Sequence, residues 1–86
     1  MKTILITGGS QGIGKSLVNQ AILNNYQVIF TYNKSKKSAT QICKKFKEKC
    51  FAIKVNLEVE KERKKLFQYI KKNKFKIDCL VNNAAY

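Results

Sequence analysis

TGGSQGIG occupies residues 7–14, between an apolar, β-branched run at residues 3–7 and a segment whose apolar positions recur at helical spacing from Ile13 to Ile22. A glycine-rich turn between a strand and a helix is the setting in which dinucleotides bind. Gly8 allows a sharp turn with positive φ, Gly12 leaves room for a pyrophosphate, and Gly14 lets the helix pack closely on the sheet. The N–H groups that begin the helix would then face the phosphates, so the turn predicts nucleotide binding.

Strands and helices alternate along the rest of the chain. Strands are expected at 27–32, 51–55 and 77–81. A second helix is expected to be capped by Ser35 or Ser38. A third helix is expected to carry Glu58, Glu60 and Glu62 in its first turn, where carboxylates meet the positive end of the helix dipole. The expected inward residues of these two helices are Ala39, Ile42, Cys43 and Phe46, and Leu66, Phe67 and Ile70. The order βαβαβαβ predicts an α/β fold, a Rossmann-type parallel sheet with helices on both faces and strand order 3-2-1-4.

The composition favours an ordinary globular protein with a basic surface. The formal net charge is +13, but the seventeen lysines and Arg63 are spread over the whole chain with no nucleic-acid-binding motif, so we expect a solvated surface and no nucleic-acid partner. No apolar run approaches the roughly 20 residues that span a bilayer, so no membrane partner is expected. Cys43, Cys50 and Cys79 form no CxxC pair and are expected to be small buried residues of a cytoplasmic protein.

The glycine spacing GxxxGxG, rather than GxGxxG, resembles the opening TGxxxGIG signature of the short-chain dehydrogenase/reductase family. Asn56 and Leu57 resemble the residues that end the family's third strand, and residues 82–85 (NNAA) resemble its NNAG motif. The sequence looks most similar to the 3-oxoacyl-acyl-carrier-protein reductases. The resemblance covers essentially all 86 residues and implies a partial NAD(P)-binding Rossmann domain over 1–86, truncated after the fourth strand.

The resemblance also implies a role for each matching residue. The phosphates and the adenosine ribose would be contacted by Gly8, Gly9, Ser10, Gln11, Gly12 and Ile13. Asn56 and Leu57 would hold the adenine, and Asn83 and Ala84 would line the path to the nicotinamide ribose. Thr7 and Asn82 are expected to make structural hydrogen bonds instead.

The end of the second strand bears on the choice of cofactor. NAD-specific sites place an acidic residue there, whereas this strand runs into Asn33, Lys34 and Lys37 with no acid nearby. Asn33 can donate to a 2′-phosphate and Lys34 or Lys37 can supply the countercharge, so NADP(H) is favoured over NAD(H). Gln11 stands where many NADP-using relatives have Arg, which argues mildly the other way.

The family's catalytic residues are a further Asn, a Ser, and a Tyr and Lys spaced as YxxxK, all later in the chain. The present residues therefore contain no catalytic group, and we expect the 86-residue chain to be inactive by itself. Tyr32 and Lys36 match the spacing, but they lie at the end of the second strand, near the adenosine end, where no catalytic role is expected. In its full-length form the protein is expected to reduce a small-molecule carbonyl substrate and to be a homo-oligomer.

Two further functions stay open at this point. The chain could be a non-catalytic, nucleotide-binding half of a Rossmann domain instead of part of a carbonyl or 3-oxoacyl reductase. A basic nucleic-acid-binding protein is the third and least favoured hypothesis. Downstream Ser and YxxxK residues would distinguish the first two, and the salt dependence of a gel shift would test the third.

Overall fold

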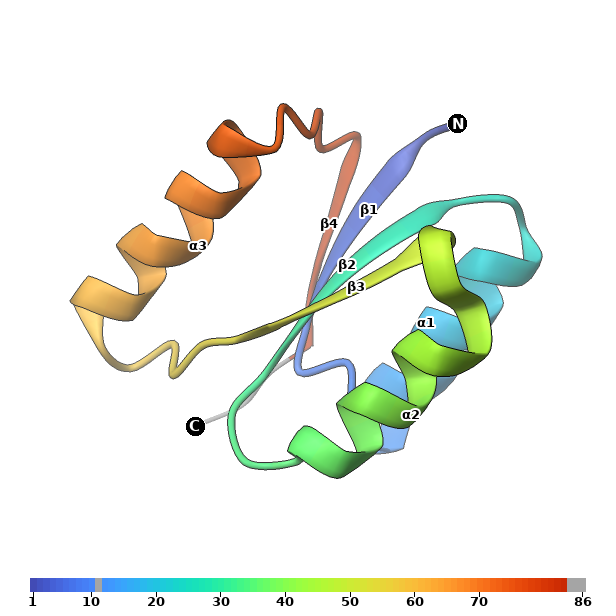
Figure 1. Ribbon diagram of the computed structural model, residues 1–86, viewed down its shortest axis with the longest axis horizontal. Coiled ribbons are helices and arrows are strands. Elements are labelled where there is room, and N and C mark those ends of the chain that lie inside the picture. The colour runs from blue at the N-terminus through green and yellow to red at the C-terminus, as the bar shows by residue number, and fades with distance from the viewer. Residues whose placement is uncertain (11, 84–86) are drawn as a thin grey trace.

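The computed structural model describes residues 1–10 and 12–83 and forms a four-stranded parallel sheet in the order β3-β2-β1-β4 (Figure 1). Along the chain the elements are β1 (Thr3–Thr7), α1 (Gly12–Leu23), β2 (Gln27–Tyr32), α2 (Lys36–Phe46), the 3₁₀ turn η1 (Lys47–Lys49), β3 (Cys50–Lys54), α3 (Glu60–Lys72) and β4 (Cys79–Asn82). In β1, Ile6 pairs with Phe30 of β2 on one side and with Val81 of β4 on the other. The predicted strand order and the alternation of strands and helices are confirmed.

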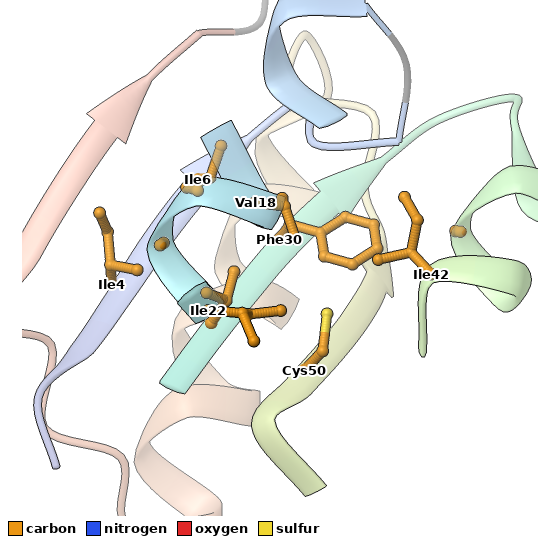
Figure 2. Packing of buried hydrophobic residues seen from close by; sticks show 10 residues of the cluster. Ile4, Ile6, Val18, Ile22, Phe30, Ile42 and Cys50 are labelled. Atoms are coloured by element: carbon orange, nitrogen blue, oxygen red, sulfur yellow. The ribbon is translucent and has the colours of Figure 1, made fainter. Parts of the chain in front are cut away.

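Helices α1 and α2 lie on one face of the sheet and α3 lies on the other (Figure 1), and an apolar cluster lies beneath the helices of each face. The larger cluster lies beneath α1 and α2, where the Phe30 ring lies beside Ile42 and Val18 (Figure 2). Its buried members are Ile4, Ile6, Val18, Ala21, Ile22, Val28, Phe30, Ala39, Ile42 and Cys50. The smaller cluster lies beneath α3 and buries Leu5, Ile29, Val55 and Leu66. Helices therefore cover both faces, as right-handed crossovers require.

Two element boundaries differ from the prediction because backbone groups have other partners. At the start of β4 the Thr3 N–H donates to the Asp78 carboxylate at 2.9 Å, so β4 begins at Cys79 and not at Ile77. The third helix begins at Glu60, because the Glu58 N–H donates to Asn56 Oδ1 at 3.0 Å in a turn that precedes the helix. Glu58 therefore does not belong to the first helical turn.

The other boundary differences are small. Helix α1 begins at Gly12 and ends before Asn25, whose φ of 66° stops it. Strand β3 begins one residue earlier than predicted, at Cys50, and ends at Lys54. Ser35 stands at the N-cap of α2, but its side chain makes no capping hydrogen bond.

Two residues expected to be buried are exposed. Phe67 is 65% exposed, and Cys79 on β4 is also exposed. Phe67 follows the buried Leu66 on α3 and lines a groove together with Leu80, which is also exposed. Among the described residues no helix is both long and apolar enough to cross a membrane.

Candidate cofactor-binding site

The carboxyl ends of the four parallel strands lie at one edge of the sheet (Figure 1). Gly8 follows β1, Asn33 follows β2, Asn56 follows β3 and Asn83 follows β4. From β1 the chain first proceeds to β2 and β3 and later returns on the other side to β4, so the strand order reverses between β1 and β4. Ligands of open α/β sheets bind at such a reversal, beyond the carboxyl ends of the strands. The fold therefore brings the described site residues to the edge where a dinucleotide would bind.

Helix α1 comes very close to the glycine turn at Gly14. A Cβ atom at Gly14 would lie 1.9 Å from the Gly8 carbonyl oxygen and 2.7 Å from Asn83 Nδ2. No side chain fits there without moving backbone atoms, so this position needs glycine. The expectation that Gly14 permits close packing is confirmed, and the close approach fixes where the first turn of α1 lies.

Polar side chains tie the end of β4 to the glycine turn. Thr7 Oγ1 donates to Asn82 Oδ1 at 3.0 Å, and the Asn83 N–H donates to Thr7 Oγ1 at 2.9 Å. The Asn83 side-chain amide donates to the Gly8 carbonyl at 3.2 Å. The structural roles expected of Thr7 and Asn82 are confirmed. Asn83 also joins this network, in addition to any contact it makes with a nucleotide.

The first turn of α1 fits the phosphates of a dinucleotide. Gly12 is exposed with a φ of 57°, and nothing lies within 4 Å of the place where its Cβ would be. The first N–H groups of a helix have no acceptor within the helix, and the helix dipole makes this end positive. The first turn of α1 contains no acidic residue. This end of α1 is therefore open, positive and able to approach an anion closely.

The segment after β2 is basic and accessible. Asn33 is half-buried, and Lys34 and Lys37 are exposed. The first acidic residue of the whole sequence is Glu48, on η1 at the far end of α2. No carboxylate of this segment can therefore pair with ribose hydroxyls or repel a 2′-phosphate.

The segment after β3 is held by the first turn of α3. The Asn56 N–H donates to Glu62 Oε1 at 2.9 Å, and Arg63 Nη1 donates to the Leu57 carbonyl at 2.6 Å. Leu57 also packs against the smaller apolar cluster. These contacts keep Asn56 and Leu57 at the same edge of the sheet as the glycine turn.

Sequence reasoning missed three residues that shape this edge. The sequence predicts Glu62 only as a charge in the first turn of a helix and Arg63 only as part of a solvated basic surface, although both anchor the segment after β3. Thr31 was interpreted as a strand residue, although its side chain bonds to Gly8. The available signal for Thr31 was a small polar residue directly after the apolar run VIF in QVIFTY, because a buried polar group needs a partner.

Two of the predicted site residues, Gln11 and Ala84, lie outside the described residues. Ala85 of the NNAA segment also lies outside them. The other predicted site residues lie at or beside this edge, and their contacts with a cofactor stay predictions: Gly8, Gly9, Ser10, Gly12, Ile13, Asn33, Lys34, Asn56, Leu57 and Asn83.

Cys50 lies away from this site. It begins β3 at the opposite edge of the sheet, and burial raises the pKa of its thiol.

Comparison with known proteins agrees with this arrangement. Residues 2–86 match the short chain dehydrogenase family. The chain belongs to this family. It is 35% identical over 87 residues to a 3-oxoacyl-[acyl-carrier-protein] reductase of Staphylococcus epidermidis, an alignment that covers 98% of this chain and 36% of the relative. A benzil reductase of Bacillus cereus is 26% identical over 89 residues, which are 99% of this chain and 36% of the relative.

The fold is also shared with solved members of the family. A short-chain dehydrogenase/reductase from Serratia marcescens superposes with a TM-score of 0.88 at 27% identity, covering 99% of this chain and 36% of the other. The present 86-residue chain therefore spans about a third of the length of these relatives and solved structures.

Proposed function

We propose that this chain is the cofactor-binding part of an NADP(H)-dependent oxidoreductase of the short-chain dehydrogenase type that reduces a carbonyl group, with a 3-oxoacyl group as the favoured substrate. The observation that carries the proposal is the glycine turn, which leads into the open N-terminus of α1 at the point where the strand order reverses. The Staphylococcus epidermidis relative supports the substrate class, since it is a 3-oxoacyl-[acyl-carrier-protein] reductase.

The residues of this chain would bind and orient the cofactor. The turn from Gly8 to Ile13, with Gln11, would receive the pyrophosphate and the adenosine ribose. Asn56 and Leu57 would hold the adenine, and Asn83 and Ala84 would line the approach to the nicotinamide ribose. When bound, the nicotinamide ring supplies hydride to the carbonyl carbon.

The choice of NADP(H) is supported by charge. A 2′-phosphate beside Asn33 and Lys34 would meet a donor and a cation, and no acidic residue precedes Glu48 in the sequence. A charge-assisted hydrogen bond contributes roughly 1.5–3 kcal/mol. At about 1.4 kcal/mol per tenfold change in affinity, one such contact gives a preference for NADPH over NADH of roughly ten- to a hundredfold.

The remaining parts of the proposal concern the whole protein. It would act in the cytoplasm as a homo-oligomer on a small-molecule carbonyl substrate, without nucleic acid or membrane as partner. The 86 residues alone would show no turnover, because none of them matches the catalytic Ser, Tyr and Lys that the family resemblance implies. NADPH absorbance should stay at the buffer rate when the chain is mixed with a panel of carbonyl compounds.

The test of cofactor choice is a calorimetric titration of the chain with NADPH and NADH, repeated for Asn33→Asp and for Asn24→Asp as a matched control. Asn24 directly follows α1 at the opposite edge of the sheet and is exposed, so its variant makes the same change of charge away from the proposed site. We expect the parent to prefer NADPH, Asn33→Asp to shift the ratio toward NADH by tenfold or more, and Asn24→Asp to leave the ratio unchanged. Equal affinity of the parent for both cofactors would contradict the NADP(H) assignment. Absence of binding to either would contradict nucleotide binding by this chain.

A further inference from the structure

Two consecutive N–H groups of the glycine turn donate to one residue of β2. The Gly8 N–H donates to Thr31 Oγ1 at 3.1 Å, and the Gly9 N–H donates to the Thr31 carbonyl at 3.0 Å. Thr31 is 1% exposed. Neither N–H group is therefore directed at a ligand, so the N–H groups that meet phosphate must come from later in the turn.

Close packing holds the turn against β2 at the same place. A Cβ atom at Gly9 would lie 2.6 Å from Phe30 Cβ and 2.9 Å from Val18 Cγ2. Phe30 is fully buried, and its ring lies in the larger cluster between α1 and α2 (Figure 2). The backbone of the turn thus rests on Phe30 while Thr31 binds its first two N–H groups.

Among the described residues, one side-chain hydrogen bond joins β2 to Gly8 at the start of the turn, and its acceptor is the Thr31 hydroxyl. The backbone bond from Gly9 would persist with any residue at position 31, whereas the bond from Gly8 needs a side-chain acceptor. Gly8 has a φ of 71°, and its carbonyl is bound by Asn83 on the other side. The Gly8 peptide groups are therefore held from β2 and from β4 at once, and Gly12 follows four residues later.

We propose that Thr31 is a positioning residue for phosphate binding: its hydroxyl holds the Gly8 N–H and thereby sets where the first turn of α1 presents its free N–H groups. The inference rests on the proposed function, since it concerns the same cofactor site. Thr31 would not touch the cofactor itself. Because NADPH and NADH have the same pyrophosphate, loss of this hydroxyl should weaken both by the same factor and leave the preference between them unchanged.

The test compares Thr31→Val, Thr31→Ser and Thr3→Val. Valine keeps the shape of threonine but cannot accept the Gly8 N–H, whereas serine can. Thr3 is a matched control: it is buried in β1 at the opposite edge of the sheet, and its hydroxyl donates to Gln27 Oε1 at 3.0 Å. Each variant is measured for thermal unfolding, for NADPH and NADH affinity, and for amide hydrogen exchange at Gly8 and Gly9 by NMR.

In Thr31→Val we expect faster exchange at Gly8 with Gly9 still protected, and at least tenfold weaker binding of both cofactors at an unchanged ratio. Thr31→Ser should retain most of the affinity. Thr3→Val should lose a similar amount of thermal stability without the loss of affinity. The inference is overturned if Thr31→Val binds both cofactors as the parent does, or if its affinity loss is matched by Thr3→Val.

A separate measurement on the parent keeps the inference testable if Thr31→Val does not fold. Gly8 and Gly9 amides should be protected from exchange, while the Gly12 amide should exchange fast and shift most strongly when NADPH is added. An unprotected Gly8 amide in the parent would overturn the inference whatever the chain binds. If the parent binds no nucleotide while Gly8 is protected, the proposed function fails, and with it the role in phosphate binding, although the contact to Thr31 stands.

Discussion

The two faces of the sheet carry the same kind of helix but are covered to very different extents. Beneath α1 and α2, ten residues of the larger cluster are buried, among them Phe30 at 0% exposure. Beneath α3 the smaller cluster buries four residues, and Phe67 and Leu80 remain 65% and 61% exposed. These two line a groove with Leu5, Leu57 and Leu66, so apolar surface on this face lies open.

The difference shows what helix periodicity can and cannot establish. A helix buries its apolar stripe only as far as the neighbouring elements reach. Two helices side by side cover one face, and each shields the flank of the other, whereas α3 lies alone among the described residues on its face. The Phe67 prediction was wrong for this reason, although the pattern that placed Leu66 inward is confirmed.

The largest expected effect is on stability and contrasts one phenylalanine from each face. Phe30→Ala should lower the free energy of unfolding by about 3–5 kcal/mol, because it opens a cavity in the covered face. Phe67→Ala should change it by less than about 0.5 kcal/mol, because its ring is mostly solvated. Urea denaturation followed by circular dichroism measures both. Similar losses for the two variants would show that the faces do not differ in packing.

A second expected effect is on self-association through the open face. Strand β4 pairs with β1 alone among the described strands, and Leu80 lies exposed on it, so we expect the 86-residue chain to associate. Leu80→Lys should weaken association about tenfold or more, since burying a Leu side chain contributes about 1.5–3 kcal/mol. Sedimentation velocity over a range of concentrations measures this.

The control for association is Leu23→Lys. Leu23 is 74% exposed at the end of α1, on the covered face, so the variant adds the same charge away from the groove. It should leave association within about twofold of the parent. A parent that stays monomeric at all concentrations would show that the open face does not mediate association.

The smallest expected effect is on the pH dependence of stability and contrasts two cysteines. Burial raises the pKa of the Cys50 thiol above its ordinary value of 9.0, with the neighbouring Cys43 adding to the shift. Above pH 9 the thiol therefore ionises in the unfolded chain while it stays protonated in the folded one. The unfolded state then binds fewer protons, so the free energy of unfolding should fall by about 1.4 kcal/mol per pH unit from this group.

Cys50→Ala should reduce that slope, and Cys79→Ala, which removes a thiol that lies exposed on β4, is the matched control. A residual slope is expected in Cys50→Ala, since burial also raises the pKa values of Cys43 and Tyr69. Urea denaturation between pH 8 and 10.5 measures the slopes. Parallel curves for the parent and Cys50→Ala would contradict a buried, protonated thiol in the folded chain.

Local patterns were sufficient for the architecture of this protein. The apolar runs predicted β1 and β2 to the residue, and the glycine spacing placed the turn and the start of α1 to within one residue. The alternation of elements predicted the strand order, because right-handed crossovers leave few arrangements. The clustering of Gly8, Asn33, Asn56 and Asn83 at one edge followed from the same reasoning, since parallel strands end at the same side.

The contacts that hold this edge together were decided by tertiary structure. Thr31 lies 23 residues from Gly8 and Asn83 lies 75, and no short-range pattern states which hydroxyl or amide satisfies which backbone group. The space that a Cβ atom at Gly14 would need is filled by Gly8 and Asn83, and these residues come together only in the folded chain. Periodicity and spacing depend on neighbours along the chain and so can be deduced from sequence. Burial of Cys79 or Phe67 depends on which distant elements cover a face, and that is settled only when the sheet is assembled.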